Sequence, residues 1–275
     1  MTNEFQSVFK QKTVCVLVPT YNNAQTLRQV LSDVLEYTNQ VVIVNDGSTD
    51  ATSEILKEFS HLCIINFPSN RGKGYALRMG FKKAVELGYD YAITIDSDGQ
   101  HYADDLPVFL KKLEDHPSSI IIGARNMEHA SIPGKSSFGH KFSNFWFWVE
   151  VGYQVNDTQS GYRLYPVKLL NDFTFITRKY EFEIEVLIRA AWSGIEVTDT
   201  PIKVFYAEKG KRISHFRPFW DFTRISILNT FLVTIALLYI HPRNFLLGIK
   251  KKTSDTSSLN NSSIPFSQTE PKQSR

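Results

Sequence analysis

Residues 91–101, "YAITIDSDGQH", place two aspartates directly after an apolar run. The run is typical of a buried strand, which would put Asp96 and Asp98 at the end of that strand, two positions apart. Asp, Ser and Gly all favour turns, so the segment could be a turn and nothing more. Two carboxylates that converge on one point could instead hold Mg²⁺ or Mn²⁺ together with a substrate phosphate. The segments on either side of this stretch distinguish the two interpretations.

These neighbouring segments alternate between apolar runs and helical patterns. The predicted strands cover residues 13–19, 40–46, 63–67, 91–96 and 119–125. The predicted helices lie between them, at residues 24–38, 51–62, 74–88 and 104–116. The alternation predicts an α/β fold with a doubly wound, mostly parallel sheet and helices on both faces. In such sheets ligands bind at the carboxyl ends of the strands.

Four polar loops leave that edge of the predicted sheet. They are "PTYNN" at 19–23, "NDGSTD" at 45–50, "NRGKG" at 70–74 and "DSDGQH" at 96–101. The ring of Tyr21 could cover a base or a ribose, and Asp46 could accept a hydrogen bond from a base. Arg71 and Lys73 stand beside glycines that allow the backbone to approach a phosphate closely. Each loop alone could be a structural turn, but together they favour a nucleotide site.

Length and composition are compatible with one large catalytic domain. The 275 residues are 42% hydrophobic, enough for a sizeable core, and the net charge of +3 gives no reason to expect a nucleic-acid partner. The first residues, "MTNEFQSVFKQK", lack the apolar segment of a signal peptide, so a cytoplasmic catalytic part is expected. We expect an N-terminal arm (1–11), a catalytic domain (12–217), a helical segment (218–249) and a disordered tail (250–275).

Residues 222–240, "FTRISILNTFLVTIALLYI", form a strongly apolar segment within the helical segment. Its length is near the lower limit for a membrane-spanning helix, roughly 17 to 25 residues. Ser and Thr recur along one side, and basic residues flank the segment, which suits an anionic leaflet. Three interpretations are open: a helix lying on the cytoplasmic face of a membrane, a single short span, or a helix that forms a homodimer. The first is favoured.

The ordered set of motifs resembles the inverting family-two glycosyltransferases. The set consists of "VPTYNN", "VVIVNDGSTD", "RGKG", "DSDGQH", "GAR" and "DTQSGYRLYP", and the resemblance covers residues 12–217. Within that family the chain is similar to the polyprenyl-phosphate sugar synthases, of the dolichyl-phosphate mannose synthase kind. The resemblance implies a GT-A fold, a nucleoside diphosphate (NDP) sugar donor, Mg²⁺ or Mn²⁺, and inversion at the anomeric carbon of the sugar.

The resemblance, together with nearby polar residues, implies three sets of candidate site residues. The predicted donor site comprises Pro19, Tyr21, Asn23, Asp46, Arg71, Lys73 and Asp96. The predicted metal ligands are Asp96, Asp98 and Gln100. The predicted acceptor-phosphate site comprises Arg125, Lys135, Lys141, Ser160, Arg163 and Arg217. Asn23 departs from the Glu that is usual in this family, and Lys135 or Lys141 stands where the synthases usually carry Arg. The catalytic candidates are Asp96, Asp98 and Asp157.

The predicted reaction moves mannose or glucose, from GDP-mannose or UDP-glucose, to a polyprenyl phosphate at the cytoplasmic face of a membrane. A lipid phosphate is already an anion and needs cations to hold it, whereas a hydroxyl acceptor needs a base. One alternative is therefore transfer to a hydroxyl of another lipid or a saccharide, with Asp157 as the base. A second alternative is a non-catalytic module that binds nucleotide sugars. A nucleotidyltransferase would need a Gly-rich, Lys-containing signature that "VLVPTYNN" lacks.

Overall fold

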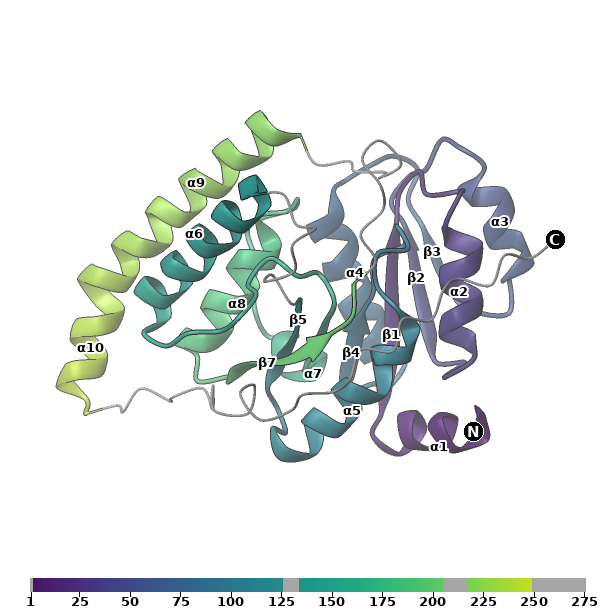
Figure 1. The fold of residues 1–275 in the computed structure, drawn as a ribbon, viewed down its shortest axis with the longest axis horizontal. Helices are drawn as coiled ribbons and strands as arrows, with labels where there is room; N and C mark the ends of the chain where they lie inside the picture. The colour runs from purple at the N-terminus through teal and green to yellow at the C-terminus, as the bar shows by residue number, and fades with distance from the viewer. Residues whose placement is uncertain (1, 126–133, 205–216, 249–275) are drawn as a thin grey trace.

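The computed structural model describes residues 2–125, 134–204 and 217–248. Its centre is a seven-stranded sheet in the order β3-β2-β1-β4-β6-β5-β7, with helices on both faces (Figure 1). The strands are β1 (Val14–Thr20), β2 (Val41–Asn45), β3 (Cys63–Asn66), β4 (Tyr91–Thr94), β5 (Ile120–Arg125), β6 (Arg163–Tyr165) and β7 (Val197–Ile202).

Ten α-helices and two shorter helical turns are found in the described part of the chain. The first five helices are α1 (Thr2–Gln11), α2 (Leu27–Leu35), α3 (Thr52–Glu58), α4 (Lys73–Glu86) and α5 (Leu106–Asp115). The others are α6 (Gly134–Val151), α7 (Val167–Leu170), α8 (Phe182–Trp192), α9 (Pro218–Ile235) and α10 (His241–Leu246). A 3₁₀ turn, η1 (Ala103–Asp105), precedes α5, and a π-helical turn, η2 (Ala236–Ile240), joins α9 to α10.

The sheet is mostly parallel, as the sequence predicts. Strands β3, β2, β1 and β4 run parallel to their neighbours, and so does β7 beside β5. The exception is β6, which pairs antiparallel with both β4 and β5. The sequence did not predict this strand, because three residues within a polar loop carry no periodic signal.

Two apolar cores lie on the two faces of the sheet, and β1 shows how they arise. Successive side chains of a strand point to opposite faces. Cys15 and Leu17 therefore pack into the core formed with α4, α7 and α8, while Val14 and Val16 pack into the core formed with α2, α3 and α5. Both faces of β1 are buried, which explains its uninterrupted apolar sequence. The predicted α/β fold with helices on both faces is confirmed.

The predicted N-terminal arm, residues 1–11, contains helix α1 (Thr2–Gln11). Helix α1 packs beside β1, and Phe9 on this helix is fully buried in the core on the α2 side. Periodicity did not predict this helix, because its position depends on long-range packing, in which the partly buried Val8 joins Phe9. The predicted disordered tail lies outside the described residues.

Helices α6 and α9 run side by side and form an outer layer over α8 (Figure 1). Leu228, Leu232, Ala236 and Ile240 recur every four residues and are buried, so one stripe of the C-terminal helix packs against the catalytic domain. The helical stretch Phe219–Leu246 is also long and apolar enough to cross a membrane, judged by length and composition alone.

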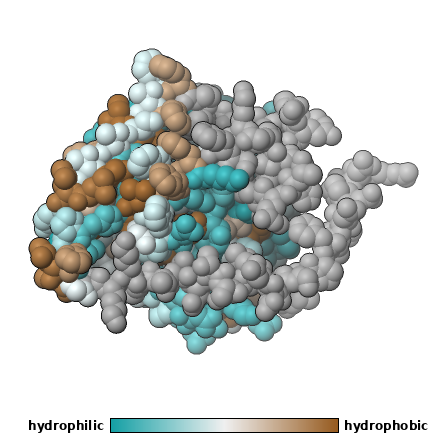
Figure 2. All heavy atoms as spheres, turned by 60° about the vertical axis from the view of Figure 1, so that its left-hand side comes forward, coloured by the Kyte–Doolittle hydropathy of each residue, from teal (hydrophilic) through white to brown (hydrophobic). Residues whose placement is uncertain are grey.

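The opposite side of this helical stretch is apolar and exposed. Figure 2 views the molecule from the side of α9 and α10 and shows apolar side chains along these helices. We call this surface the apolar face. Its most prominent members are Phe219, Trp220, Ile227, Phe231, Leu238 and Phe245. On the neighbouring helix α6, Phe145 and Trp148 are exposed as well.

Beneath this layer, α6 carries a buried carboxyl group. Glu150 is only 1% exposed, and neither of its carboxyl oxygens has a hydrogen-bond partner among the described residues. The backbone carbonyl of Glu150 accepts a hydrogen bond from Trp192 Nε1, which ties α6 to α8. Burial raises the pKa of Glu150 to about 8, so the carboxyl is protonated at neutral pH.

Because of this one carboxyl group, the free energy of unfolding should fall as the pH rises. The folded protein holds a proton on Glu150 that the unfolded chain releases above its ordinary pKa of 4.5. The protonated Glu150 contributes its full share to the free energy of unfolding below pH 4.5. This share is lost as the pH rises toward 8, at about 1.4 kcal/mol per pH unit. Urea unfolding of the wild type and of Glu150→Gln, which cannot ionise, isolates this effect.

Relative to wild type, Glu150→Gln should gain about 3–5 kcal/mol in free energy of unfolding between pH 5 and pH 8. Other titrating groups cancel in this comparison because both proteins carry them. A difference that stays constant across this range would show that Glu150 ionises normally in the folded protein.

Candidate functional site

A cavity of about 1050 Å³ lies at the carboxyl ends of β1, β2 and β4. It collects residues from all four polar loops predicted at this edge, and from α6, α8 and α9 on its other side. Sequence-predicted residues in its lining are Pro19, Tyr21, Asn23, Asp46, Lys73, Asp96, Asp98, Gln100, Arg125, Arg163 and Arg217. The structure thus brings most of the predicted donor, metal and acceptor residues to one place.

Asp46, which is 3% exposed, organises the side of the cavity at which the sequence predicts a nucleotide. Its two carboxylate oxygens accept hydrogen bonds from the backbone N–H groups of Arg71 (2.7 Å) and Gly72 (2.8 Å). Gly47 has a positive φ of 71°, and a Cβ there would lie 2.3 Å from the carbonyl carbon of Ser69. The loops after β2 and β3 are therefore locked together, with Asp46 as the link between them.

Burial raises the pKa of Asp46, although the two backbone N–H groups oppose this effect. A carboxylate already used in this way positions the loop at residues 70–72. Contact with a nucleotide base, the predicted role of Asp46, would have to use its remaining lone pairs.

Asp96 and Asp98 lie in the cavity wall just beyond the end of β4. Asp98 accepts hydrogen bonds from the backbone N–H of Gln100 (3.0 Å) and from Gln100 Nε2 (2.8 Å). The predicted metal ligands Asp98 and Gln100 are thus in direct contact. Between the two aspartates, Ser97 is buried and donates a hydrogen bond to the carbonyl oxygen of Pro19 (3.1 Å), which fixes the turn against β1.

Asp96 is paired with a lysine from the neighbouring loop. Lys73 Nζ lies 2.9 Å from Asp96 Oδ2 and 3.1 Å from Glu183 Oε1. Burial alone would raise the pKa of Asp96, but the charge of Lys73 outweighs it and lowers that pKa. Burial alone would lower the pKa of Lys73, and the two carboxylates outweigh it and raise that pKa. Asp96 and Lys73 are therefore both charged at neutral pH.

His101 completes this wall of the cavity. Burial lowers the pKa of His101 to about 4 despite the nearby Asp96 charge, so its imidazole is neutral at physiological pH. Its Nδ1 has no hydrogen-bond partner among the described residues. A neutral, partly unsatisfied imidazole next to Asp96 can accept a hydrogen bond from a ligand or support a metal-bound group.

The oxygen donors at this point fit Mg²⁺ or Mn²⁺. Such ions take hard oxygen ligands and commonly combine one or two carboxylates with substrate phosphates rather than a closed cage of protein groups. Asp96, Asp98 and the amide oxygen of Gln100 supply that kind of incomplete set. No group of three or more His, Cys, Asp or Glu side chains that could hold a metal ion is found in the described part of the chain.

Where the sequence predicts the acceptor-phosphate site, Arg125 and Asp157 form a bidentate pair. Arg125 Nε lies 2.6 Å from Asp157 Oδ2, and Arg125 Nη2 lies 3.0 Å from Asp157 Oδ1. Asp157 is fully buried, and although burial alone would raise its pKa, the charge and hydrogen bonds of Arg125 lower it. Asp157 does not line the cavity as Arg125 does. It is placed to orient the guanidinium of Arg125 toward the cavity.

Arg163 is the largest fully buried side chain in the described part of the chain. It donates hydrogen bonds to three backbone carbonyl oxygens and to the hydroxyl oxygen of Tyr165. The carbonyls belong to Thr158, Ser160 and Glu183. Four of the five N–H groups of a guanidinium are used in this way. This arrangement ties the loop after α6 to α8 and leaves little capacity to bind a phosphate, the role that the sequence predicts.

Other predicted residues are placed away from the cavity. The guanidinium of Arg71 stacks on Tyr75, 4.6 Å from the ring centroid, and Arg71 is not among the residues that line the cavity. Ser160 is buried, and Lys141 is exposed on α6 without lining the cavity. The side chain of Lys135 lies outside the description. The functional roles of these residues stay predictions.

The C-terminal half supplies cavity residues that the sequence did not single out. Lys179 and Tyr180 come from the segment just before α8, Glu183 from its first turn, and Asp221 and Asn229 from α9. Glu183 stands in the first turn of α8, and acidic residues are typical of that position in a helix. Only the packing of α8 against the sheet brings Glu183 to Lys73, and no local pattern encodes that contact.

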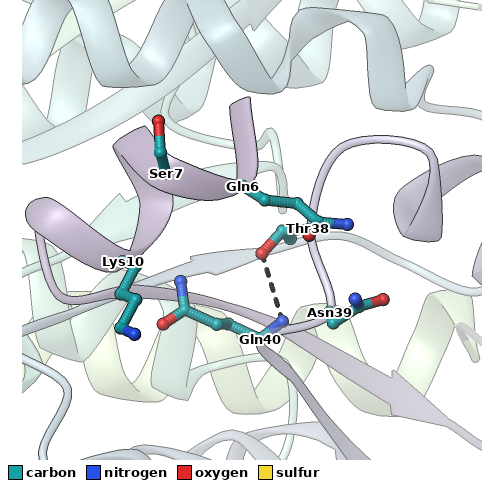
Figure 3. Close-up of a pocket in the computed structure, with 6 residues that line it drawn as sticks. All are labelled: Gln6, Ser7, Lys10, Thr38, Asn39 and Gln40. Carbon is teal, nitrogen blue, oxygen red and sulfur yellow. Dashed lines mark hydrogen bonds between the residues drawn. The ribbon is translucent and has the colours of Figure 1, made fainter. Parts of the chain in front are cut away.

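A smaller depression of about 320 Å³ lies between α1 and the segment before β2 (Figure 3). Its described lining consists of Gln6, Ser7, Lys10, Thr38, Asn39 and Gln40. The backbone N–H of Gln40 donates to Thr38 Oγ1 within it. These side chains are neutral or basic, and the described lining contains no carboxylate that could activate a nucleophile. The depression therefore offers no chemistry comparable to the cavity at the sheet edge.

The solved structures that share this fold include glucosyl-3-phosphoglycerate synthase from Mycobacterium tuberculosis. In its complex with Mn²⁺, UDP and glucosyl-3-phosphoglycerate, it matches with a TM-score of 0.59, covering 87% of this chain and 84% of that one, at 18% identity. At that identity the likeness shows the fold alone, which is of the predicted GT-A type.

Curated relatives extend the similarity to sequence. UDP-N-acetylglucosamine–dolichyl-phosphate N-acetylglucosaminyltransferase from Methanococcus voltae is 29% identical over 72% of this chain and 87% of its own length. Polyprenol monophosphomannose synthase from Mycolicibacterium smegmatis is 28% identical over 73% of this chain and 80% of its own length. Dolichyl-phosphate beta-glucosyltransferase from Drosophila melanogaster is 29% identical over 76% of this chain and 71% of its own length.

The family model described as glycosyl transferase family 2 matches residues 15–173, more than half of the chain. That range includes β1 to β6, the Asp96/Asp98 turn and the Arg125–Asp157 pair. The fold, the motifs and the site geometry agree with this match. The chain is a glycosyltransferase and belongs to glycosyl transferase family 2.

Proposed function

We propose that this enzyme transfers a sugar from an NDP-sugar to a polyprenyl phosphate at the cytoplasmic face of a membrane. One observation carries the proposal: a single cavity joins the Asp96/Asp98 turn and Arg125 to apolar side chains of the outer helices. Phe142 of α6 and Phe222 of α9 line the cavity and are themselves 40% and 55% exposed. Such a site can accommodate a charged reacting group with an apolar chain attached.

The state of Asp157 favours a phosphate acceptor over a hydroxyl acceptor. A general base works best when its pKa lies near the operating pH and when it reaches the proton that it removes. Asp157 is buried, its pKa is lowered, and both of its oxygens are held by Arg125. A lipid phosphate can attack the anomeric carbon without losing a proton, and it needs a cation such as Arg125 to hold it.

The donor side would be held by the loops around Asp46 and the Asp96/Asp98 turn. Asp96, Asp98 and Gln100 would hold Mg²⁺ or Mn²⁺, and the bound ion would neutralise charge on the departing diphosphate. Lys73 lies beside Asp96 and can add a further positive charge there. The relatives' names support an NDP-sugar donor and a lipid-phosphate acceptor, but they divide among N-acetylglucosamine, mannose and glucose.

The test is a donor and acceptor screen with the full-length protein and Mn²⁺. Radiolabelled GDP-mannose, UDP-glucose and UDP-N-acetylglucosamine are each supplied with polyprenyl phosphate or with the corresponding polyprenol, and label is counted in the organic phase. We expect label with polyprenyl phosphate, none with polyprenol, and loss of the signal in EDTA. Label with polyprenol would favour a hydroxyl acceptor. No transfer with any donor, together with retained nucleotide binding, would favour a non-catalytic module.

For membrane association, we propose that the apolar face lies on the bilayer rather than that the helix spans it. The buried stripe along α9 and η2 keeps this helix packed against the catalytic domain, which a spanning helix would have to leave. The apolar face remains available for the headgroup and acyl boundary, as in interfacial helices. In this orientation the cavity mouth beside Phe222 would open close to the membrane surface.

Replacing Ile227 and Phe231 together by Ser should weaken binding to anionic lipid vesicles at least about tenfold, since burying each side chain is worth about 1.5–3 kcal/mol. Vesicle co-sedimentation measures the change. Ile176→Ser is the matched control, because Ile176 and Ile227 are both 66% exposed but Ile176 lies outside α9. Unchanged vesicle binding, with a shift from dimer to monomer in solution, would favour a dimerisation helix instead.

A further inference from the structure

Lys73 lies between two carboxylates that come from different parts of the fold. Its Nζ is 2.9 Å from Oδ2 of Asp96, after β4, and 3.1 Å from Oε1 of Glu183, in the first turn of α8. The side chains of these three residues are 18%, 25% and 12% exposed, so the ion pairs are largely shielded from water. Glu183 has no role in the predicted site and none in the function proposed above.

The three groups meet over a residue that has no side chain. A Cβ on Gly161 would lie 2.8 Å from Lys73 Nζ, 2.9 Å from Asp96 Oδ2 and 3.1 Å from Glu183 Oε1. The ammonium therefore contacts both carboxylates from one position, and a small movement of a flexible side chain is enough to leave one while keeping the other. Only glycine leaves room for this arrangement.

Asp96 cannot pair with Lys73 and bind a divalent cation equally well at the same time. If the proposed function is right, the cation needs Asp96 as an oxygen ligand, and an ammonium already pairs with one of its oxygens. Two positive groups at one carboxylate repel each other strongly where water is largely excluded. Lys73 must then move away from Asp96, and an ammonium left buried without a partner would oppose cation binding.

We propose that Glu183 is a positioning residue that holds Lys73 when a divalent cation takes its place at Asp96. Before the cation binds, Lys73 neutralises Asp96 and keeps it in the cavity wall. After the exchange, the pair with Glu183 retains Lys73 beside the site, where its charge can face the donor diphosphate. This inference rests on the proposed metal site and assigns a role to Glu183 that the family motifs do not.

The test measures binding of Mn²⁺ alone to the full-length protein, from the electron paramagnetic resonance signal of free Mn²⁺. Glu183→Gln preserves the shape of the side chain and the backbone carbonyl that accepts from Arg163. We expect it to raise the Mn²⁺ dissociation constant about tenfold, a typical coupling between neighbouring charged groups. Lys73→Met removes the competing ammonium, and we expect it to lower the dissociation constant.

The double variant separates an exchange from a general electrostatic effect. If Glu183 acts through Lys73, Glu183→Gln should have almost no effect in the Lys73→Met background. If Glu183 only adds negative charge to the region, it should weaken Mn²⁺ binding equally in both backgrounds, and the proposal is then wrong. Glu181→Gln is the control, because Glu181 also begins α8 but forms no ion pair with Lys73 among the described residues.

Failure of this inference differs from failure of the metal site itself. If wild-type protein binds no Mn²⁺, or if Asp98→Asn leaves the affinity unchanged, then the proposed metal site is wrong. If wild type binds Mn²⁺ through Asp98 but Lys73→Met weakens that binding, only the exchange is wrong. The Lys73→Met result decides this even if Glu183→Gln does not fold.

Discussion

Replacement of Asp98 by Asn should lower sugar transfer at least about 1000-fold, which corresponds to about 4 kcal/mol of lost transition-state stabilisation. Asn keeps the size of the side chain and can still accept a hydrogen bond from the backbone N–H of Gln100. It lacks the anionic oxygens that a hard cation requires. The fold should survive, because the substitution changes one cavity-lining carboxylate and no core contact.

Transfer is measured under saturating donor and Mn²⁺, and the free energy of unfolding is measured in urea. Asp104→Asn is the matched control, since Asp104 is an acidic residue from the following turn that pairs with Lys203 at the surface. The control should retain nearly full transfer. If Asp98→Asn retained transfer within about tenfold of wild type, the carboxylate pair would not be central to the reaction.

The second large effect is on stability. Arg163→Met should lower the free energy of unfolding by about 3–5 kcal/mol, as expected when a buried charged group is removed from its partners. Arg163 is fully buried and its guanidinium donates four hydrogen bonds. Met fills a similar apolar volume but leaves the carbonyl oxygens of Thr158, Ser160 and Glu183 without these donors.

Urea unfolding of Arg163→Met is compared with that of Lys141→Met, which removes an exposed cation from α6 and should change stability by less than about 0.5 kcal/mol. The comparison also tests the acceptor-phosphate role that the sequence predicts for Arg163. If Arg163 mainly bound phosphate, Arg163→Met would leave stability nearly unchanged and raise the KM for the lipid acceptor.

The fold was predictable from the sequence where local patterns determine the secondary structure. The continuous apolar run of β1 and the polar loops that contain Asp46 and Asp98 predicted the edge of the sheet at which the cavity lies. Strand β6 and helix α1 were missed, because one is three residues long and the other is held by the single buried side chain of Phe9. Their positions depend on long-range packing, which periodicity does not report.

The sequence predicted which residues gather at the site, but it predicted less well what each of them contacts. Motif positions brought Arg163 and Arg71 into the prediction as cations for phosphate. In the structure, backbone carbonyls hold the first, and the ring of Tyr75 holds the second. Conversely, Glu183 is not among the predicted site residues, and it reaches Lys73 only because α8 packs against the sheet. Which group each side chain contacts in the cavity depends on tertiary packing, which local sequence patterns do not report.

The proposed reaction depends on a cation held at the turn after β4. The most direct measurement is anomalous diffraction at the manganese edge from crystals grown with Mn²⁺ and a nucleoside diphosphate. We predict one strong peak within coordination distance of carboxylate oxygens of Asp96 and Asp98, with diphosphate oxygens on its open side. Manganese bound elsewhere, or diphosphate bound in the cavity with no metal at these aspartates, would contradict the account.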